Sequence, residues 1–320
     1  MANELHVNEP ERIYGLVEHG EISVSEALSM IRKSTNQFGK AEVEISKEER
    51  IAKIQRELTK LIGLDSVKSL VLEIQAFVEI TQRRISARLA SDPVVLHMIF
   101  KGNPGTGKTT VARIIGKLFL EMGVLSKGHS VEVERADLVA EYIGQTAQRT
   151  REQLRKAAGG ILFIDEAYSL ARGGEKDFGK EAIDTMVKTM EDQRSDLIVI
   201  LAGYSEPMEE FLETNPGLKS RFPITIEFPD YSAFELFKIA EEMLEQRDYQ
   251  LNKAARRKLF RIIEDVRKKE QVNFGNARAI RNLIEKSIRQ QAVRLVSKKT
   301  TSRTQLMEIS DDDIQEVVDA

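Results

Sequence analysis

The residue types best suited to chemistry lie in one glycine-rich segment, which reads Gly-Asn-Pro-Gly-Thr-Gly-Lys-Thr and fits the pattern G-x-x-x-x-G-K-S/T. Glycines let backbone N–H groups approach a phosphate chain without a Cβ in the way, and the start of a helix supplies further donors. A glycine-rich turn with a solvated lysine is the alternative, but the apolar run before the segment favours a phosphate site. The expected contact residues are Gly102, Asn103, Pro104, Gly105, Thr106, Gly107, Lys108, Thr109 and Thr110.

Two side chains of this segment and two carboxylates further on have separate expected roles. The Lys108 ammonium would reach the β- and γ-phosphates of a nucleoside triphosphate, and the Thr109 hydroxyl would ligate Mg²⁺. The apolar run 161–164 ends in Asp165 and Glu166, at the end of a strand that would meet the phosphates. Asp165 would hold the Mg²⁺ shell and Glu166 would act as general base toward water. An acidic turn is the alternative for this pair.

Five apolar runs are expected to form the strands that position these groups, with helical periodicity between them. Runs of Val, Ile and Leu that mostly do not alternate suit a parallel sheet covered by helices on both faces, in an α/β fold. The expected strands are 94–100, 130–134, 161–164, 197–201 and 224–228. The expected helices are 47–61 and 66–89 before the sheet, and 232–247, 252–269, 276–297 and 310–318 after it.

Capping signals and changes in pattern divide the chain into three expected parts. Residues 1–45 contain two short amphipathic pieces, with a capping box at Ser23 and Glu26, and are expected to form a helical hairpin and linker. Residues 46–230 carry the alternation of strands and helices and are expected to form the α/β nucleotide-binding domain. Residues 231–320 contain only helical patterns and are expected to form an all-helical domain.

The composition argues against several other classes of protein. The 320 residues have a formal net charge of -3, so no overall charge attracts the chain to nucleic acid or to an anionic membrane. The chain has no cysteine and its four histidines are scattered, which makes a thiolate or histidine metal cage unexpected. The apolar stretches are shorter than a membrane helix, and the start lacks the apolar core of a signal peptide. We therefore expect a cytoplasmic protein with no membrane span.

The phosphate segment and the carboxylate pair together resemble the nucleotide motifs of AAA+ ATPases. Ile62 and Gly63, with the leucine that follows, are similar to the strip that contacts adenine in that family. Residues 215–222 are similar to its arginine-finger segment, and 275–278 to its sensor 2 motif. The resemblance implies an AAA+ core followed by a helical lid, ATP and Mg²⁺ as cofactors, ATP hydrolysis, and a ring homo-oligomer, expected to be a hexamer.

The resemblance also implies roles for two arginines and a tyrosine. Arg221 would stabilise transition-state charge at the γ-phosphate of a neighbouring subunit, with a loop-capping surface arginine as the alternative. Arg278 begins a helix, where a cation is disfavoured unless an anion lies nearby, and would contact the γ-phosphate of its own subunit as the lid closes. The family usually places a polar sensor 1 residue, commonly Asn, after the fourth strand. Tyr204 is the candidate here, with a packing tyrosine as the alternative.

The segment after the second expected strand is similar in position to the loop that lines the central pore in hexameric members of the family, so it is a candidate pore loop. Tyr142 and Ile143 precede a glycine, which is expected to make the loop mobile. The bulky aromatic side chain of Tyr142 could then contact and hold a polypeptide. A tyrosine packed at a helix start is the alternative. The string Tyr-Ile-Gly-Gln-Thr, together with the segments 202–204 and 215–218, resembles the branch of the family that contains the red-type rubisco activase. The resemblance also extends to sporulation proteins of that branch.

Two functions remain open from the sequence. The first is a hexameric ATPase that remodels an unidentified client protein, with a role in sporulation implied by the resemblance. The second is a structural assembly in spore formation whose nucleotide cycle controls ring or polymer formation without threading. A DNA-dependent motor is disfavoured, because the candidate pore loop carries no lysine or arginine between Leu138 and Thr146.

Overall fold

The computed structural model describes residues 16–21, 23, 26–27, 46–91, 94–142, 144–172, 178–192, 196–269 and 275–315. The chain divides into two compact units, Met1–Arg50 and Ile51–Ala320. In the first unit the predicted capping box is present. The Ser23 N–H donates to Glu26 Oε2 at 2.9 Å, and the Glu26 N–H donates to Ser23 Oγ at 3.3 Å. Most of the predicted hairpin lies outside the described residues.

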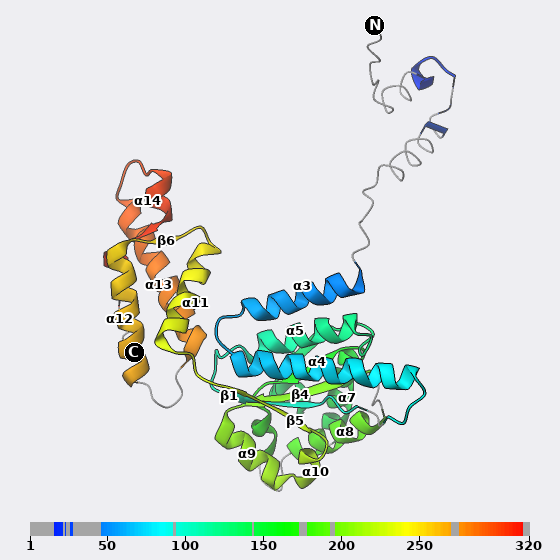
Figure 1. Ribbon diagram of the computed structural model, residues 1–320. Helices are drawn as coiled ribbons and strands as arrows, with labels where there is room; N and C mark the ends of the chain where they lie inside the picture. The colour runs from blue at the N-terminus through cyan, green and yellow to red at the C-terminus, as the bar shows by residue number, and fades with distance from the viewer. Residues whose placement is uncertain are drawn as a thin grey trace. The chain divides into compact units, whose positions relative to one another are not determined.

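A five-stranded parallel sheet lies at the centre of the second unit, in the order β2-β3-β4-β1-β5 (Figure 1). Its strands are β1 (Met98–Gly102), β2 (Ser130–Val133), β3 (Ile161–Ile164), β4 (Ile198–Gly203) and β5 (Ile224–Phe228). β1 and β4 each begin and end later in the sequence than the predicted strands 94–100 and 197–201. The register pairs Lys101 with Gly203, and both residue types are uncommon in strands. Backbone pairing with buried neighbours extends the ladder regardless of side-chain type.

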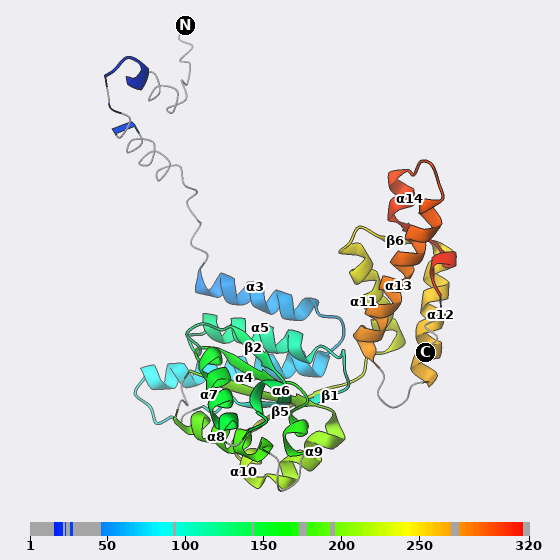
Figure 2. The ribbon, with the colours of Figure 1, turned by 180° about the vertical axis from the view of Figure 1, so that it is seen from behind.

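Both faces of the sheet are buried, because successive side chains of a strand point to opposite faces. Met98 and Phe100 belong to one apolar cluster, together with helices α4 (Asp65–Ser86) and α5 (Lys108–Glu121). Ile99 belongs to a second cluster, with helices α7 (Gln145–Ala157), α8 (Gly179–Asp192) and α9 (Ser205–Thr214). Figures 1 and 2 show α4 and α5 on one side of the strands and α8 and α9 on the other. This two-sided burial explains the unalternating apolar runs in the sequence.

Two helices before the sheet lie close to their predicted positions, and the others lie between strands, where helical periodicity was predicted. They are α3 (Lys47–Lys60), α4 (Asp65–Ser86), α5 (Lys108–Glu121), α6 (Arg135–Leu138), α7 (Gln145–Ala157), α8 (Gly179–Asp192), α9 (Ser205–Thr214) and α10 (Pro216–Lys219), with a 3-10 turn η1 (Ala167–Ala171). The predicted fold class, a parallel sheet with surrounding helices, is confirmed. Within the described ranges no helix is both long enough and apolar enough to cross a bilayer.

A helical lid follows β5. It contains α11 (Ala233–Glu245), α12 (Lys253–Lys269), α13 (Asn276–Val296) and α14 (Arg303–Met307), and it adds two short parallel strands, β6 (Gln250–Leu251) and β7 (Glu308–Ile309). The helix predicted over 310–318 is wrong in its described part, which forms a 3-10 turn, η3 (Asp311–Asp313). Ser310 and Asp313 do form a capping box, but it closes this single turn. The pairing of β7 with β6 fixes the preceding residues in an extended form.

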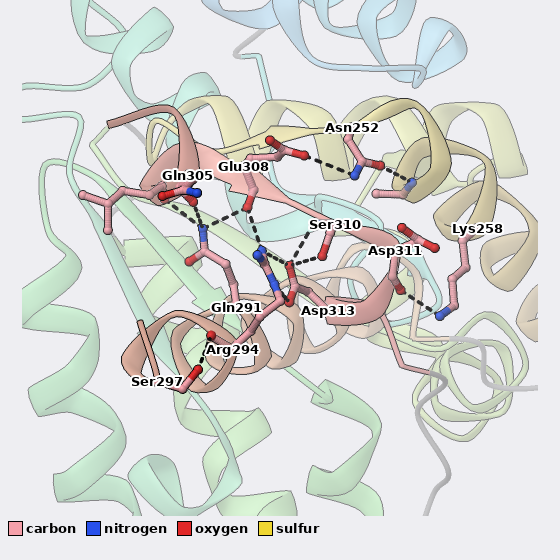
Figure 3. A network of polar contacts seen from close by, with 12 residues as sticks. Asn252, Lys258, Gln291, Arg294, Ser297, Gln305, Glu308, Ser310, Asp311 and Asp313 are labelled. Carbon is pink, nitrogen blue, oxygen red and sulfur yellow. Dashed lines mark hydrogen bonds and ion pairs between the residues drawn. The ribbon is translucent and has the colours of Figure 1, made fainter. Parts of the chain in front are cut away.

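A polar network holds this last segment against α13 (Figure 3). Arg294 donates to both carboxylate oxygens of Asp313, at 2.7 Å from Nε and 2.7 Å from Nη2. The Gln291 amide donates to the Leu306 and Glu308 carbonyls at 2.8 and 3.0 Å. The Asp313 side chain is 1% exposed, so its charge depends on Arg294 and on the Ser310 capping contacts.

The Asp313 carboxyl titrates below its usual range. Burial raises its pKa, but the hydrogen bonds from Arg294 and Ser310 outweigh burial and lower the pKa from 3.8. A carboxyl whose folded pKa is depressed contributes stability above its unfolded pKa. That contribution is lost as the pH falls through the folded pKa, so acid loosens this part of the lid.

Replacement of Arg294 with Met is expected to lower the free energy of unfolding by roughly 3 kcal/mol, because Asp313 keeps a buried charge without its partner. Urea unfolding of the full chain measures the change. Arg289→Met is the matched control, since Arg289 is exposed on the same helix and pairs with no described carboxylate. Its effect should stay within about 0.5 kcal/mol. Equal unfolding midpoints for the two variants would show that the ion pair contributes nothing.

Candidate nucleotide-binding site

Three neighbouring parallel strands end at the same edge of the sheet and define the candidate site. β1 runs into the glycine-rich loop, β3 into Asp165 and Glu166, and β4 into Tyr204. All three ends line a cavity of about 650 Å³, which is also lined by Ile62 on one side and by Arg278 of the lid. The carboxyl edge of a parallel sheet is where ligands bind in α/β folds.

The glycine-rich loop has a backbone that side chains would disrupt. Gly107 has φ of 96°, in the left-handed region, and α5 begins at the next residue. Gly105 has φ of 70°, and a Cβ there would lie 2.4 Å from the Gly275 carbonyl oxygen and 2.8 Å from the Arg278 nitrogen. The loop therefore presents backbone donors at the start of a 14-residue helix, an arrangement that binds phosphate.

Lys108 lies inside the loop. Its ammonium donates to the Gly102 carbonyl at 2.7 Å and to the Asn103 carbonyl at 2.8 Å. Burial lowers the pKa of Lys108, and the nearby Asp165 carboxylate opposes that shift. The Lys108 cation and the Asp165 anion thus face the same cavity, the arrangement that a triphosphate with a divalent cation requires.

Glu166 is held in an unusual backbone conformation at the end of β3. Its φ of 45° lies in the left-handed region, which is uncommon for a residue with a side chain. Its backbone N–H donates to Asp165 Oδ1 at 3.0 Å, which orients the Asp165 carboxylate. Burial and the Glu166 charge raise the pKa of Tyr168 to about 12, which keeps that phenol protonated beside the carboxylate. Strained residues of this kind concentrate at functional sites.

Tyr204 and the lid complete the lining. Tyr204 directly precedes α9, and its ring centroid lies 6.1 Å from that of Tyr168, so it both packs and reaches the cavity. Arg278 and Arg281 lie three residues apart on α13 and both line the cavity. No described carboxylate pairs with either guanidinium. Arg281 was not predicted at the site, although its spacing of three residues from Arg278 places both on the same face of a helix.

Not every residue predicted at the site lines the cavity. Asn103 donates its amide to both Asp230 carboxylate oxygens at 3.0 Å, and the buried Thr106 hydroxyl donates to the Asn103 carbonyl at 2.8 Å. These two residues stabilise the loop through hydrogen bonds and do not face the cavity. Gly63 also lies outside the lining, against Glu235. The predicted residues that line the cavity are Ile62, Gly102, Pro104, Gly105, Gly107, Lys108, Thr109, Thr110, Asp165, Glu166, Tyr204 and Arg278.

Arg221 lies toward the opposite edge of the sheet. β5 runs parallel to β1 with Ile224 beside Met98, so Arg221 lies near the start of β1 and the glycine-rich loop lies at its end. A strand of 5 residues spans about 16 Å. The guanidinium donates to Glu191 Oε1 from Nε at 3.1 Å and to the Gly217 carbonyl at 2.7 Å. Arg221 therefore does not line the cavity of its own chain.

Tyr142 lies away from the cavity, between α6 and α7. Its side chain is 67% exposed, whereas the stems of its loop are fixed. The fully buried Thr146 accepts a hydrogen bond from the Ala140 N–H at 3.0 Å. Ile143, the other residue predicted in this loop, lies outside the described residues. The arrangement presents an aromatic ring to solvent on an anchored loop.

Comparison with known proteins identifies the family. Residues 98–230 match the ATPase family associated with various cellular activities (AAA), and residues 232–319 match the AAA lid domain. The chain is 53% identical to stage V sporulation protein K of Bacillus subtilis over 287 residues, which cover 88% of this chain and 89% of that protein. The chain belongs to the AAA ATPase family. The predicted enzyme class, a P-loop ATPase, is confirmed.

Two further proteins are similar to the chain. A chloroplastic ribulose bisphosphate carboxylase/oxygenase activase of Cyanidioschyzon merolae is 42% identical over 258 residues, which cover 80% of this chain and 87% of that protein. The predicted resemblance to the activase branch of the AAA family is thereby confirmed. A solved RuvB structure from Thermotoga maritima superimposes with a TM-score of 0.50 at 20% identity, over 78% of this chain and 69% of that one, and shows the fold alone.

Lys108→Ala is expected to abolish ATP binding, because the cavity loses the ammonium group that would contact the phosphates. Calorimetric titration of the full chain with ATP measures this. Glu166→Gln is the matched control: it keeps the shape of the site and should still bind ATP, while kcat falls by about 10²- to 10⁴-fold. An undiminished ATP affinity in Lys108→Ala would contradict the phosphate assignment.

Proposed function

We propose that the cavity binds ATP with Mg²⁺ and that the chain uses hydrolysis to remodel a partner protein. The chemical part rests on one observation, the convergence of a cation, a hydroxyl and two carboxylates with a lid arginine at one cavity. These residues are Lys108, Thr109, Asp165, Glu166 and Arg278. A hydroxyl beside a carboxylate is the donor set that Mg²⁺ prefers, so the residues present fit the ion.

Each side chain would have one task in hydrolysis. Thr109 and Asp165 would hold Mg²⁺, which neutralises charge on the phosphates when bound. Glu166 would take a proton from the attacking water, and the strained backbone at that position would keep its carboxylate directed at the cavity. Lys108 and Arg278 would stabilise charge on the phosphate oxygens from the loop and from the lid. Tyr204 would orient the water from the end of β4.

Arg221 would complete the site of a neighbouring subunit. Its place toward the far edge of the sheet supports action in trans, because it cannot reach the cavity of its own chain. Glu191 and the Gly217 carbonyl hold the guanidinium, and this reduces the entropy lost on meeting a phosphate. The AAA chains would then assemble head to tail into a ring, expected to be a hexamer, in which each subunit supplies an arginine to the next.

Mixing Arg221→Ala chains with Lys108→Ala chains is expected to restore part of the ATP hydrolysis that each variant lacks. Alone, Arg221→Ala should lose about 10³-fold in kcat. In a mixed ring, an intact cavity of one variant can meet an intact arginine of the other. A mixture of Lys108→Ala with Glu166→Gln is the control, since both lesions lie in the same cavity and no site becomes complete. No recovery in the first mixture would show that Arg221 does not act in trans.

The remodelling part of the proposal rests on Tyr142. An exposed ring on an anchored loop is suited to contact an unfolded or extended polypeptide. The Bacillus subtilis relative is named for sporulation, and the Cyanidioschyzon relative is named as an activase of another enzyme. Similarity to both supports a role in sporulation through action on a client protein. The alternative is an ATP-controlled structural assembly in spore formation, in which Tyr142 grips nothing.

Tyr142→Ala separates these two functions. The variant is expected to hydrolyse ATP near the wild-type rate, yet to fail in supporting spore formation in Bacillus subtilis cells that lack stage V sporulation protein K. Spore yield is the measurement, with the wild-type chain as reference. Phe234→Ala is the matched control, because Phe234 is an exposed aromatic (57%) on the lid. A normal spore yield from Tyr142→Ala chains would favour the structural assembly.

A further inference from the structure

Asn276, the first residue of α13, is buried in an unusual conformation. Its side chain is fully inaccessible, and its φ of 44° lies in the left-handed region. Residues other than glycine rarely adopt this region, although Asn does so more readily than most. Such a conformation persists only where its surroundings enforce it, so the contacts of this side chain indicate what it does.

The Asn276 amide joins the lid to the connector that follows β5. Its Oδ1 accepts a hydrogen bond from the Tyr231 N–H at 3.0 Å, and its Nδ2 donates to Asp230 Oδ1 at 2.7 Å. The same Nδ2 donates to the Pro104 carbonyl at 3.3 Å, within the glycine-rich loop. One side chain thus bonds the phosphate loop and the connector between sheet and lid, and all three bonds depend on an amide that both donates and accepts.

The glycine-rich loop is bonded to the same two segments at four consecutive residues, 103–106. Asn103 donates to Asp230, and the Thr106 carbonyl accepts from the Tyr231 hydroxyl at 3.1 Å. The Gly105 carbonyl accepts from the N–H of Ala277 at 3.2 Å. Since the Pro104 carbonyl accepts from Asn276, each residue of 103–106 is bonded either to the start of α13 or to the connector between sheet and lid.

We infer that Asn276 is a positioning residue that couples the conformation of the phosphate loop to the placement of Arg278. Arg278 follows Asn276 by two positions on α13, so the contacts that fix the start of the helix also fix where the guanidinium enters the cavity. A shift of the loop around phosphate then moves the lid arginine with it. This inference rests on the role proposed above for Arg278.

The chemistry of the site explains why Asn suits this position. An Asp would place a second carboxylate 2.7 Å from Asp230 and would lose both donated bonds. An Ala would leave the Tyr231 N–H without its acceptor and would still be strained at this φ. A Gly adopts the backbone without strain and removes only the amide, so Asn276→Gly isolates the contribution of the side chain.

A double-mutant cycle tests the coupling. Asn276→Gly is expected to lower kcat by about 10- to 100-fold in the wild-type background, since small misplacements of a charge-stabilising group cost this much. In the Arg278→Ala background the same change should have almost no further effect, because the group that it positions is gone. Asn103→Ala, which removes only the two hydrogen bonds to Asp230, should show a smaller loss with the same non-additivity.

Asn252→Gly is the matched control. Asn252 also caps a lid helix, donating to Glu308 and accepting from the Ala255 N–H, but it has no contact with the loop. It should leave kcat unchanged, and thermal unfolding of every variant checks the fold. Losses from Asn276→Gly and Arg278→Ala that simply multiply would overturn the coupling, as would an unchanged kcat in Asn276→Gly. An unchanged kcat in Arg278→Ala alone would instead refute the proposed role of Arg278.

Discussion

The parallel register of β3, β4 and β1 is the constraint on which the candidate site depends. Because the three strands run the same way and pair as neighbours, their carboxyl ends lie at one edge. Residues that are far apart in the sequence, such as Gly102 and Glu166, are brought to one cavity without any direct bond between their segments. Two-sided burial of the sheet fixes this register, since a slip by one residue would exchange the two apolar faces.

Much of this arrangement could be predicted from the sequence, because its signals are local. The spacing of glycines and Lys108 defines a loop that needs no distant partner to be recognised. The pair Asp165 and Glu166 follows an apolar run whose bounds matched β3. Helix starts with capping boxes were also predictable, as at Ser232, where both reciprocal bonds are present.

The features that were missed depend on contacts between distant segments. The role of Asp230 and the burial of Asn276 cannot be predicted from neighbouring residues, because the bond between their side chains joins residues that are far apart in the chain. The end of β4 extended beyond its apolar run because Gly203 pairs with Lys101. The helix predicted over 310–318 is a single 3-10 turn in its described part, and it follows Ile309, whose pairing with the distant Leu251 no local pattern reveals.

The pairing of β6 with β7 has a consequence for the order of assembly. β6 follows the first lid helix and β7 follows α14, so the small sheet that joins them cannot form until the later strand has been synthesised. The main sheet needs nothing beyond Phe228, where β5 ends. During synthesis the nucleotide half can therefore fold while the lid is still an incomplete chain, and the lid closes its own structure last. Contacts of such long sequence separation also slow its folding.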